Sequence, residues 1–380
     1  MRQLSALMGA LALTVATAAF ADDTAAWLVK MSNAAHDTTY DGVVVYRSNR
    51  MLDTFHVTHR FQNGAELERV RSLNGDVSDI LKTGNKLICL LPKDRRLSIN
   101  PPTPKGMFPG LTLERVQQFA QIYRLDDLGK ARVAGRICRG IAITPRDQYR
   151  YGYEVWADSQ TAVPLKVNLI GRDGTMLEQM MFTEVSFPTT IPDSAFQQPA
   201  AAGDQKRITR DLPPPNMATT VATAPPTESV DWTLSHLPPG FKVVMRDVRV
   251  LPNNGGTVEH LMVSDGLSAI SIFSAEHPHA AKPLNGMSEI GAVSAYGRMV
   301  GDFHVTVVGE APPQTVRMIG DGLRAAVAQA ETTPAAVSGV EAATEVTPVA
   351  GAIDPGVSAA PAAAAPPLLS PAPAAGDNAQ

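Results

Sequence analysis

The stretch TFHVTHRFQNGAELERVRSLNGDVSDILKTGNKLICLL, residues 54–91, decides the fold of the first half of the chain. Turn sequences recur in it at regular intervals: Asn63-Gly64, Asn74-Gly75 and Thr83-Gly84-Asn85. Asn-Gly supplies the positive φ angles that two-residue hairpins require. Between the turns, Phe55, Val57 and Phe61 alternate with polar residues, which is typical of a sheet with one covered face. The stretch therefore predicts an antiparallel meander over residues 40–99.

Two amphipathic segments, 24–35 and 112–123, are expected to form helices that cover this sheet, because their apolar residues recur at helical spacing. Strands are expected to resume after the second helix, over residues 131–143, 149–157, 165–170 and 176–185. A long, strongly bent antiparallel sheet wrapped on a few helices is the predicted architecture. Its inner surface would be apolar and would offer a hydrophobic pocket.

The chain divides into two domains. Its 380 residues, 44% of them hydrophobic, suffice for two buried cores. We expect a large domain over 22–198, a Pro/Ala/Thr-rich linker over 199–228 and a small α+β domain over 229–327. Within the small domain, Asp265-Gly266 predicts a hairpin, and residues 315–327 are expected to form a closing helix. The tail, 328–380, is so rich in Ala and Pro that we expect disorder.

The first 21 residues resemble an export signal. Arg2 precedes an uncharged apolar run from Leu4 to Phe20, and Ala19 and Ala21 are small residues suited to cleavage after Ala21. An uncleaved membrane anchor is the alternative, but such an anchor needs about 20 apolar residues. We therefore expect a cleaved signal peptide and an exported, soluble protein in an oxidising compartment.

Two cysteines remain after such cleavage, Cys89 and Cys138. An even number of cysteines in an exported chain permits one disulfide, which would stabilise the fold by about 3–4 kcal/mol if unstrained. Both also lie in apolar, strand-like runs, so two buried thiols are equally consistent with the sequence.

No enzyme class is indicated by the sequence, which lacks nucleophile-elbow, zinc-protease, dinucleotide and phosphate-loop motifs. His56 and His59 would point to opposite faces of a strand, so they do not form a metal pair. The 33 basic and 37 acidic residues give a net charge of -4, which argues against nucleic-acid binding. The sequence favours a binding protein without a cofactor.

Several runs resemble the MucB/RseB family of periplasmic regulators of the sigma-E envelope-stress system. The amino-terminal half carries three of these runs, at residues 40–46, 67–75 and 88–92. The carboxy-terminal half carries the others: HLMVSDGLS at 260–268, LPPGF at 237–241, and AY at 295–296 followed by VGDFHVTVVGE at 300–310. The resemblance covers about residues 25–325.

This resemblance implies an α+β fold: a half-open antiparallel β-barrel capped by helices, similar to the LolA/LolB lipoprotein carriers, plus a smaller α+β C-terminal domain. It also implies a periplasmic protein that binds the periplasmic domain of a membrane anti-sigma factor of the RseA/MucA type. The bound protein would shield that factor from regulated proteolysis, and lipid or lipopolysaccharide would release it. The resemblance leaves a homodimer open.

Candidate residues can be named for the lipid pocket and for the partner-binding surface. The lipid pocket would be lined by inward strand residues, and the alternative for each is ordinary core packing: Val43, Val45, Leu90, Val155 and Val167. Phe241 and Tyr296 are expected as exposed aromatic anchors for the partner, because such residues often dominate interfaces. The alternative is that both are buried in the small domain.

Two rival functions stay open. The protein could be a periplasmic lipid or lipoprotein carrier without an anti-sigma partner, although a second domain argues against that function. The cavity could instead hold a hydrolytic site, which a panel of ester substrates would reveal.

Overall fold

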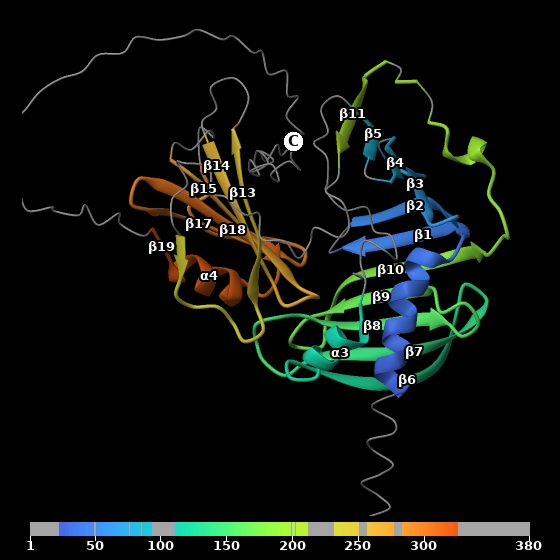
Figure 1. Ribbon diagram of the computed structural model, residues 1–380, viewed down its shortest axis with the longest axis horizontal. Coiled ribbons are helices and arrows are strands. Elements are labelled where there is room, and N and C mark those ends of the chain that lie inside the picture. The colour runs from blue at the N-terminus through green and yellow to red at the C-terminus, as the bar shows by residue number, and fades with distance from the viewer. Residues whose placement is uncertain are drawn as a thin grey trace, which may run out of the picture.

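The structure is a computed structural model, and it describes residues 23–48, 51–75, 77–84, 86–92, 111–198, 200–201, 203–211, 232–250, 257–276 and 283–325. The predicted signal segment, the tail and most of the predicted linker lie outside these residues. The described chain forms two bodies, a large domain up to residue 211 and a small domain from residue 232 (Figure 1). None of the described helices is long and apolar enough to cross a membrane.

The large domain is built on one curled antiparallel sheet, which confirms the predicted half-open barrel. Among the described residues it has 11 strands in the order β11-β5-β4-β3-β2-β1-β10-β9-β8-β7-β6. The strands are β1 (Tyr40–Ser48), β2 (Met51–Gln62), β3 (Ala65–Ser72), β4 (Asp79–Thr83), β5 (Lys86–Pro92), β6 (Tyr123–Val133), β7 (Arg136–Pro145), β8 (Gly152–Asp158), β9 (Pro164–Ile170), β10 (Met176–Ser186) and β11 (Gln205–Asp211).

The turn chemistry explains the hairpins. Asn63 and Gly64 join β2 to β3 with φ angles of 53° and 74°, as a two-residue turn of this kind requires. Their strands then pair in register, with Val57 opposite Val70. Both side chains are buried on the inner face of the sheet.

Helices cover the inner face, as expected. The described part of the first helix spans residues 23–37 and lies across β6–β10 (Figure 1). The second, α3 (Leu113–Phe119), is capped by the Thr112 hydroxyl, which accepts a hydrogen bond from the Arg115 N–H. It is shorter than expected, because the chain turns at residues 120–122 and enters β6 at Tyr123.

The large domain extends further along the chain than predicted, so the predicted start of the linker at residue 199 is wrong. The predicted linker 199–228 contains β11, which pairs with β5 and places Ile208 opposite Cys89. The preceding segment, with the 3-10 helix η1 (Asp193–Phe196), lies over the outer face, where Arg69 donates to the Ala195 carbonyl at 2.8 Å. The Pro-rich composition obscured this short edge strand.

The small domain is a six-stranded antiparallel sheet covered by one helix within the described residues. Its order is β13-β14-β15-β18-β17-β16. The strands are β13 (Lys242–Val250), β14 (Thr257–Ser264), β15 (Ala269–Ala275), β16 (Gly286–Ile290), β17 (Val293–Val300) and β18 (Phe303–Glu310), and a separate pair is formed by β12 (Trp232–Leu234) and β19 (Leu323–Ala325).

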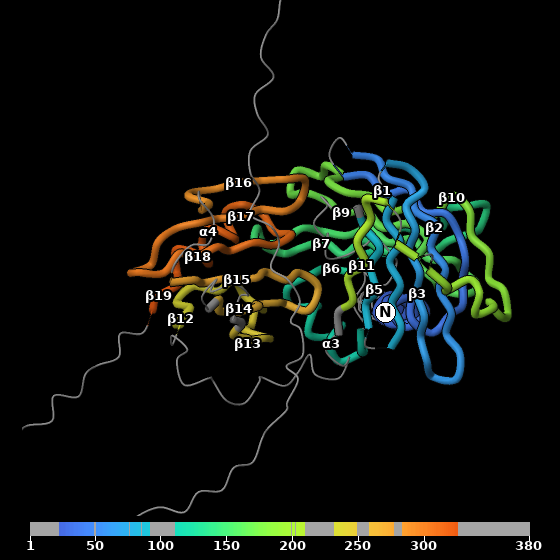
Figure 2. The backbone as a smooth tube through the Cα atoms, turned by 90° about the horizontal axis from the view of Figure 1, so that it is seen from above, coloured from blue at the N-terminus to red at the C-terminus, as the bar shows by residue number. Residues whose placement is uncertain are grey.

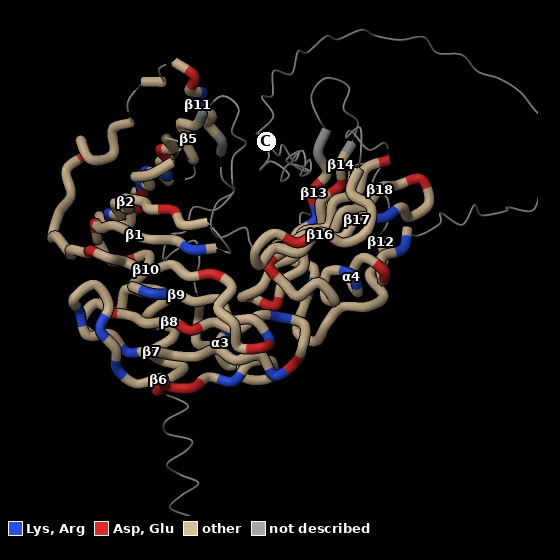
Figure 3. The backbone as a smooth tube through the Cα atoms, turned by 180° about the vertical axis from the view of Figure 1, so that it is seen from behind, with Lys and Arg blue, Asp and Glu red and all other residues tan. Residues whose placement is uncertain are grey.

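The helix of the small domain, α4 (Pro313–Gly322), begins and ends earlier than expected. Leu323 leaves the helical conformation and pairs with Leu234 in the two-stranded sheet. Val316, Ile319 and Leu323 are fully buried in the core of this domain. In the view of Figure 3, acidic and basic positions are interspersed over both domains, as their near-equal totals lead one to expect.

Candidate functional site

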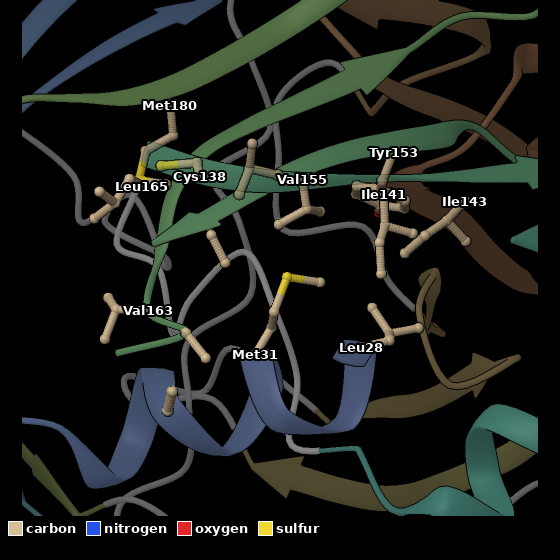
Figure 4. Packing of buried hydrophobic residues seen from close by; sticks show 14 of the residues in the cluster. Leu28, Met31, Cys138, Ile141, Ile143, Tyr153, Val155, Val163, Leu165 and Met180 are labelled. Carbon is tan, nitrogen blue, oxygen red and sulfur yellow. The ribbon is translucent and has the colours of Figure 1, made fainter. Parts of the chain in front are cut away.

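The apolar interior of the large domain lies between the sheet and the first helix. Register pairs place Met180, Val167, Val155 and Ile141 in one row across β10, β9, β8 and β7. All four side chains are fully buried. From the opposite side, Leu28 and Met31 of the helix point toward this row (Figure 4). Val155 and Val167 therefore face inward as predicted, and they pack in a filled core.

Three other predicted pocket residues face outward, and this part of the prediction is wrong. Val44, between Val43 and Val45, is the buried residue of β1, and it pairs with Phe55 and Phe182. Val43 and Val45 are only half-buried and lie on the opposite face.

Leu90 is buried, but on the outer face, where it pairs with Asp79. The carboxylate of Asp79 is bound by Arg69 beneath the η1 segment. The face that carries Leu90 is therefore covered by polar contacts of the large domain itself and does not belong to the inner surface.

The junction between the domains is centred on Arg150, whose side chain is fully buried. Its Nη1 lies 2.5 Å from Oδ2 of Asp265, and its Nη2 lies 2.8 Å from Oδ2 of Asp147. Nη2 also donates to the Pro239 carbonyl of the small domain at 2.6 Å. A buried charge is tolerated only when it is paired and hydrogen-bonded, and every polar side of this guanidinium is satisfied.

Asp265 lies at the tip of the β14–β15 hairpin, the turn that the sequence predicted. Its Oδ1 accepts hydrogen bonds from the N–H groups of Leu267 and Ser268, at 2.9 and 2.8 Å. Its Oδ2 accepts from Arg150 and, at 2.9 Å, from the hydroxyl of Tyr123 at the start of β6. The side chain of Asp265 is fully buried, so the hairpin is held both internally and against the large domain.

Sequence reasoning identified neither partner of this ion pair. Arg150 stands between two tyrosines in a stretch expected to be a strand, and Asp265 has the residue type of an ordinary hairpin turn. The two residues are 115 positions apart, and no local pattern links them.

Phe241 belongs to the same junction, and its prediction as an exposed anchor is wrong. It is 5% exposed, and its ring centroid lies 4.9 Å from the guanidinium carbon of Arg150. Tyr296 is half-buried, its hydroxyl donates to Asp321 at 2.8 Å, and its ring packs against Gly320 of α4. Both aromatic residues thus have contacts within the chain.

A second contact joins the domains at the end of β1. Gly291, in the β16–β17 turn, approaches so closely that a Cβ atom built on it would lie 2.7 Å from the Ser48 Oγ. Ser48 and Tyr46 both donate to the buried carboxylate of Glu178, at 3.0 and 2.5 Å. Figure 2 shows β16 and β1 along the same side of the molecule.

Charge repulsion opposes the docking of the two domains, whereas apolar packing favours it. Burial, and then the neighbouring Glu178 carboxylate, raises the pKa of Glu310 to about 7. Ala292 belongs to the large domain's apolar cluster, and Leu267 packs against that cluster. The small domain therefore helps to close the apolar interior of the large one.

Two features of the described residues concern the ligand sets of metal sites and the lining of a ligand cavity. They contain no group of three or more His, Cys, Asp or Glu that could hold a metal ion. A cavity of about 290 Å³ beside the junction is lined both by charged residues and by apolar ones: Asp147, Arg150, Glu154 and Arg172, and Ala142, Ile143, Pro145, Tyr153 and Ile170.

The possible disulfide is not formed in the structure. Cys89 and Cys138 are both buried and are not bridged to each other. Burial, and then the Asp158 carboxylate, raises the pKa of Cys138 to about 11.

Comparison with known proteins finds similarity over both domains. The MucB/RseB N-terminal domain family matches residues 23–200, and the MucB/RseB C-terminal domain family matches residues 226–324. The sigma factor AlgU regulatory protein MucB of Pseudomonas aeruginosa is 28% identical over 331 residues, 85% of this chain and 98% of the relative. The sigma-E factor regulatory protein RseB of Escherichia coli K12 is 26% identical over 309 residues, 80% of this chain and 91% of the relative.

A solved structure is similar over the same extent. The complex structure of Pseudomonas aeruginosa MucA/MucB aligns with a TM-score of 0.61 and 27% identity, covering 80% of this chain and 100% of that chain.

Proposed function

Because the chain belongs to the MucB/RseB family, we propose that it is a periplasmic regulator that binds the periplasmic segment of a membrane anti-sigma factor. Bound there, it shields the anti-sigma factor from proteolysis and keeps the stress sigma factor silent. Lipid or lipopolysaccharide entering the large domain weakens the complex. The observation that carries the proposal is the similarity, over both domains, to a MucB solved together with MucA.

The lipid site is the interior beneath the first helix, with Val155 and Val167 on its floor. This interior is filled, so a lipid enters only by displacing side chains of the helix. Full burial of Leu28 and Met31 stabilises the closed form by about 1.5–3 kcal/mol each. A buried methylene contributes about 0.8 kcal/mol, so four to eight methylenes of an acyl chain, roughly, compensate for both.

Both buried and exposed polar contacts hold the helix. In a buried position, the Leu111 N–H donates to the Ser32 hydroxyl at 2.6 Å. Asp23 pairs with Arg139 at 2.7 Å, but its side chain is 64% exposed. Exposed ion pairs typically contribute less than about 1 kcal/mol. Arg139 also lies over the Trp27 ring, 5.6 Å from its centroid. Opening therefore costs the burial of the apolar side chains and the buried Ser32 hydrogen bond, while the exposed ion pair contributes little.

The domain junction couples this interior to the partner. Leu267 and Ala292 of the small domain pack against the same apolar cluster that a lipid would enter. Leu267 lies two residues after Asp265 and donates its N–H to the Asp265 carboxylate, so displacement of this hairpin strains the ion pair with Arg150. Tyr296 stays a candidate partner contact of the small domain. Coupling of this kind is reciprocal: a lipid that weakens partner binding tenfold, about 1.4 kcal/mol, is itself bound tenfold more weakly in the complex.

The experiment is capture of the chain from residue 22 onward by an immobilised periplasmic segment of a candidate anti-sigma factor of the MucA type. Lipopolysaccharide fragments are added in half of the samples, and a site-specific protease reports shielding. We expect tight capture and slow cleavage without lipid, and loss of both with lipid. Absence of capture by folded protein would reject the regulator and favour a lipid carrier.

A further inference from the structure

Four large apolar side chains of the large domain are exposed at two neighbouring turns. Met51 and Leu52 begin β2 and are 56% and 60% exposed, while Leu73 and Val77 flank the β3–β4 turn and are 53% and 57% exposed. We call these four residues the apolar rim. Isolated exposed apolar residues need no explanation, but a group at one edge of a domain marks an interaction surface.

Specific hydrogen bonds fasten the two turns together. The Leu73 N–H donates to the Thr54 carbonyl at 2.8 Å. The Asn74 side chain accepts from the Thr54 N–H at 2.6 Å and donates to the Leu52 carbonyl at 3.1 Å. Asn74 therefore ties the second turn to the start of β2. Hydrogen bonds of Thr54 and Asn74 thus hold Leu52 and Leu73 next to each other.

Arginines lie next to the apolar side chains. Arg47 pairs directly with Leu52 in the β1–β2 register, so the two side chains share a face. Arg71, also exposed, lies two residues before Leu73, and its Nη2 lies 2.6 Å from the Nδ1 of His56. Asp53 is the acidic residue of the same segment and is half-buried. Asp79 is buried and bound by Arg69. Over residues 47–53 and 71–77 the sequence has three arginines and two aspartates, so the net charge of these two segments is +1.

This combination fits a lipid surface better than a peptide. Turn tips supply no walls to enclose a peptide, whereas aliphatic side chains at a tip enter the acyl boundary of a bilayer without needing walls. Arginine beside them reaches anionic headgroups with its charge while its stem stays in apolar surroundings.

We propose that the apolar rim is a membrane-docking surface that seats in the interface of an anionic bilayer. Met51, Leu52, Leu73 and Val77 enter the boundary region, and Arg47 and Arg71 contact lipid phosphates. This surface lies outside the interior in which a lipid ligand would bind, and the proposal does not depend on an anti-sigma partner.

The test is flotation of the chain from residue 22 onward with vesicles of phosphatidylethanolamine and phosphatidylglycerol. The double variant Leu52→Ser, Leu73→Ser removes half of the apolar rim, and we expect its partitioning to fall at least tenfold. Ile137→Ser is the matched control, because Ile137 is 55% exposed but lies on β7, away from the rim. Its partitioning stays unchanged, and thermal unfolding verifies the fold of each variant.

The arginine variant and the charge of the lipid separate the electrostatic contribution to vesicle binding from the apolar one. Arg47→Gln lowers partitioning into anionic vesicles, and neutral phosphatidylcholine vesicles bind less protein than anionic ones. Equal flotation of wild type and double variant would overturn the proposal. Absence of wild-type flotation would also overturn it. If, in addition, the double variant lost binding to the anti-sigma segment, the apolar rim would be assigned to a peptide instead.

Discussion

The carboxylate of Asp265 lies 2.5 Å from the guanidinium of Arg150, and both side chains are fully buried between the two domains. An intact buried ion pair adds little to stability. Removing one partner destabilises the protein strongly, because the other charge is then buried without a counter-charge. The domains are thus fastened at a point where a small displacement has a large energetic effect.

Asp265→Ala should therefore weaken the docking of the domains by about 3–5 kcal/mol. Urea unfolding followed by tryptophan fluorescence would then separate into two transitions, since Trp232 reports on the small domain while Trp27 and Trp156 report on the large one. The double variant Asp265→Leu, Arg150→Met removes both charges of the pair and should recover part of the loss, because Asp147, which is 22% exposed, then loses its Arg150 contacts.

Asp173→Ala is the control for this prediction, because Asp173 lies in an exposed turn of the large domain. Its change in stability should stay within about 0.5 kcal/mol. A single unfolding transition in Asp265→Ala at the wild-type midpoint would show that the ion pair does not hold the domains together.

Docking of the small domain should weaken as pH rises. The pKa of Glu310 is raised from 4.5 to about 7 where the domains meet, so the docked form retains a proton that the separated form releases. Docking is accordingly most favourable near pH 4.5 and loses stability until pH passes 7. Glu310 is nevertheless exposed to solvent, so the repulsion from Glu178 is strongly screened and the effect is small.

The measurement is the urea midpoint of the small-domain transition between pH 5.5 and 8. Glu310→Gln, which cannot ionise, should flatten this dependence and retain the low-pH stability at pH 8. An equally steep dependence in Glu310→Gln would assign it to another group.

Met31→Ala should affect stability and lipid binding in opposite directions. Removal of this fully buried side chain costs about 2–5 kcal/mol of folding stability. The same deletion lowers the cost of lifting the first helix, so a fluorescent fatty acid should bind more tightly. The exposed substitution Ala26→Ser serves as the control. Weaker lipid binding in a folded Met31→Ala protein would contradict entry beneath the helix.

The thiols offer a simple chemical check. Because Cys89 and Cys138 are buried and unbridged, the native protein should react slowly with a disulfide reagent at pH 8, and the raised pKa of Cys138 keeps its thiol protonated there. In denaturant without reductant, two thiols per chain should react. Protein purified from the periplasm that yields none would establish a disulfide.

The sequence was sufficient to predict most of the strands, because alternation and Asn-Gly turns are local signals. The predicted strand 131–143 is wrong: the chain turns at Ala134 and Gly135, and this region is the hairpin of β6 and β7.

The sequence was insufficient to predict which side chains of β1 point to the inner face of the sheet, because Val43, Val44 and Val45 form an apolar run without alternation. The inward residue is Val44, because its neighbours Phe55 and Phe182 bring it under the helix. Such a choice depends on two other strands and has no signature within the run.

The junction was also beyond reach of local patterns. Phe241 is an aromatic residue after a turn, and its burial is decided by Arg150 from the other domain. The family resemblance indicated the class of partner, and only the fold shows that the Asp265 hairpin meets the large domain's apolar interior.

The most direct test of lipid-controlled partner binding is isothermal titration of the anti-sigma factor's periplasmic segment into the chain, with and without lipopolysaccharide fragments, for wild type and Asp265→Ala. We expect lipid to weaken wild-type binding at least tenfold. In Asp265→Ala we expect this difference largely to disappear, because the domains no longer move together. Equal affinity of the wild type with and without saturating lipid would contradict lipid control of partner binding.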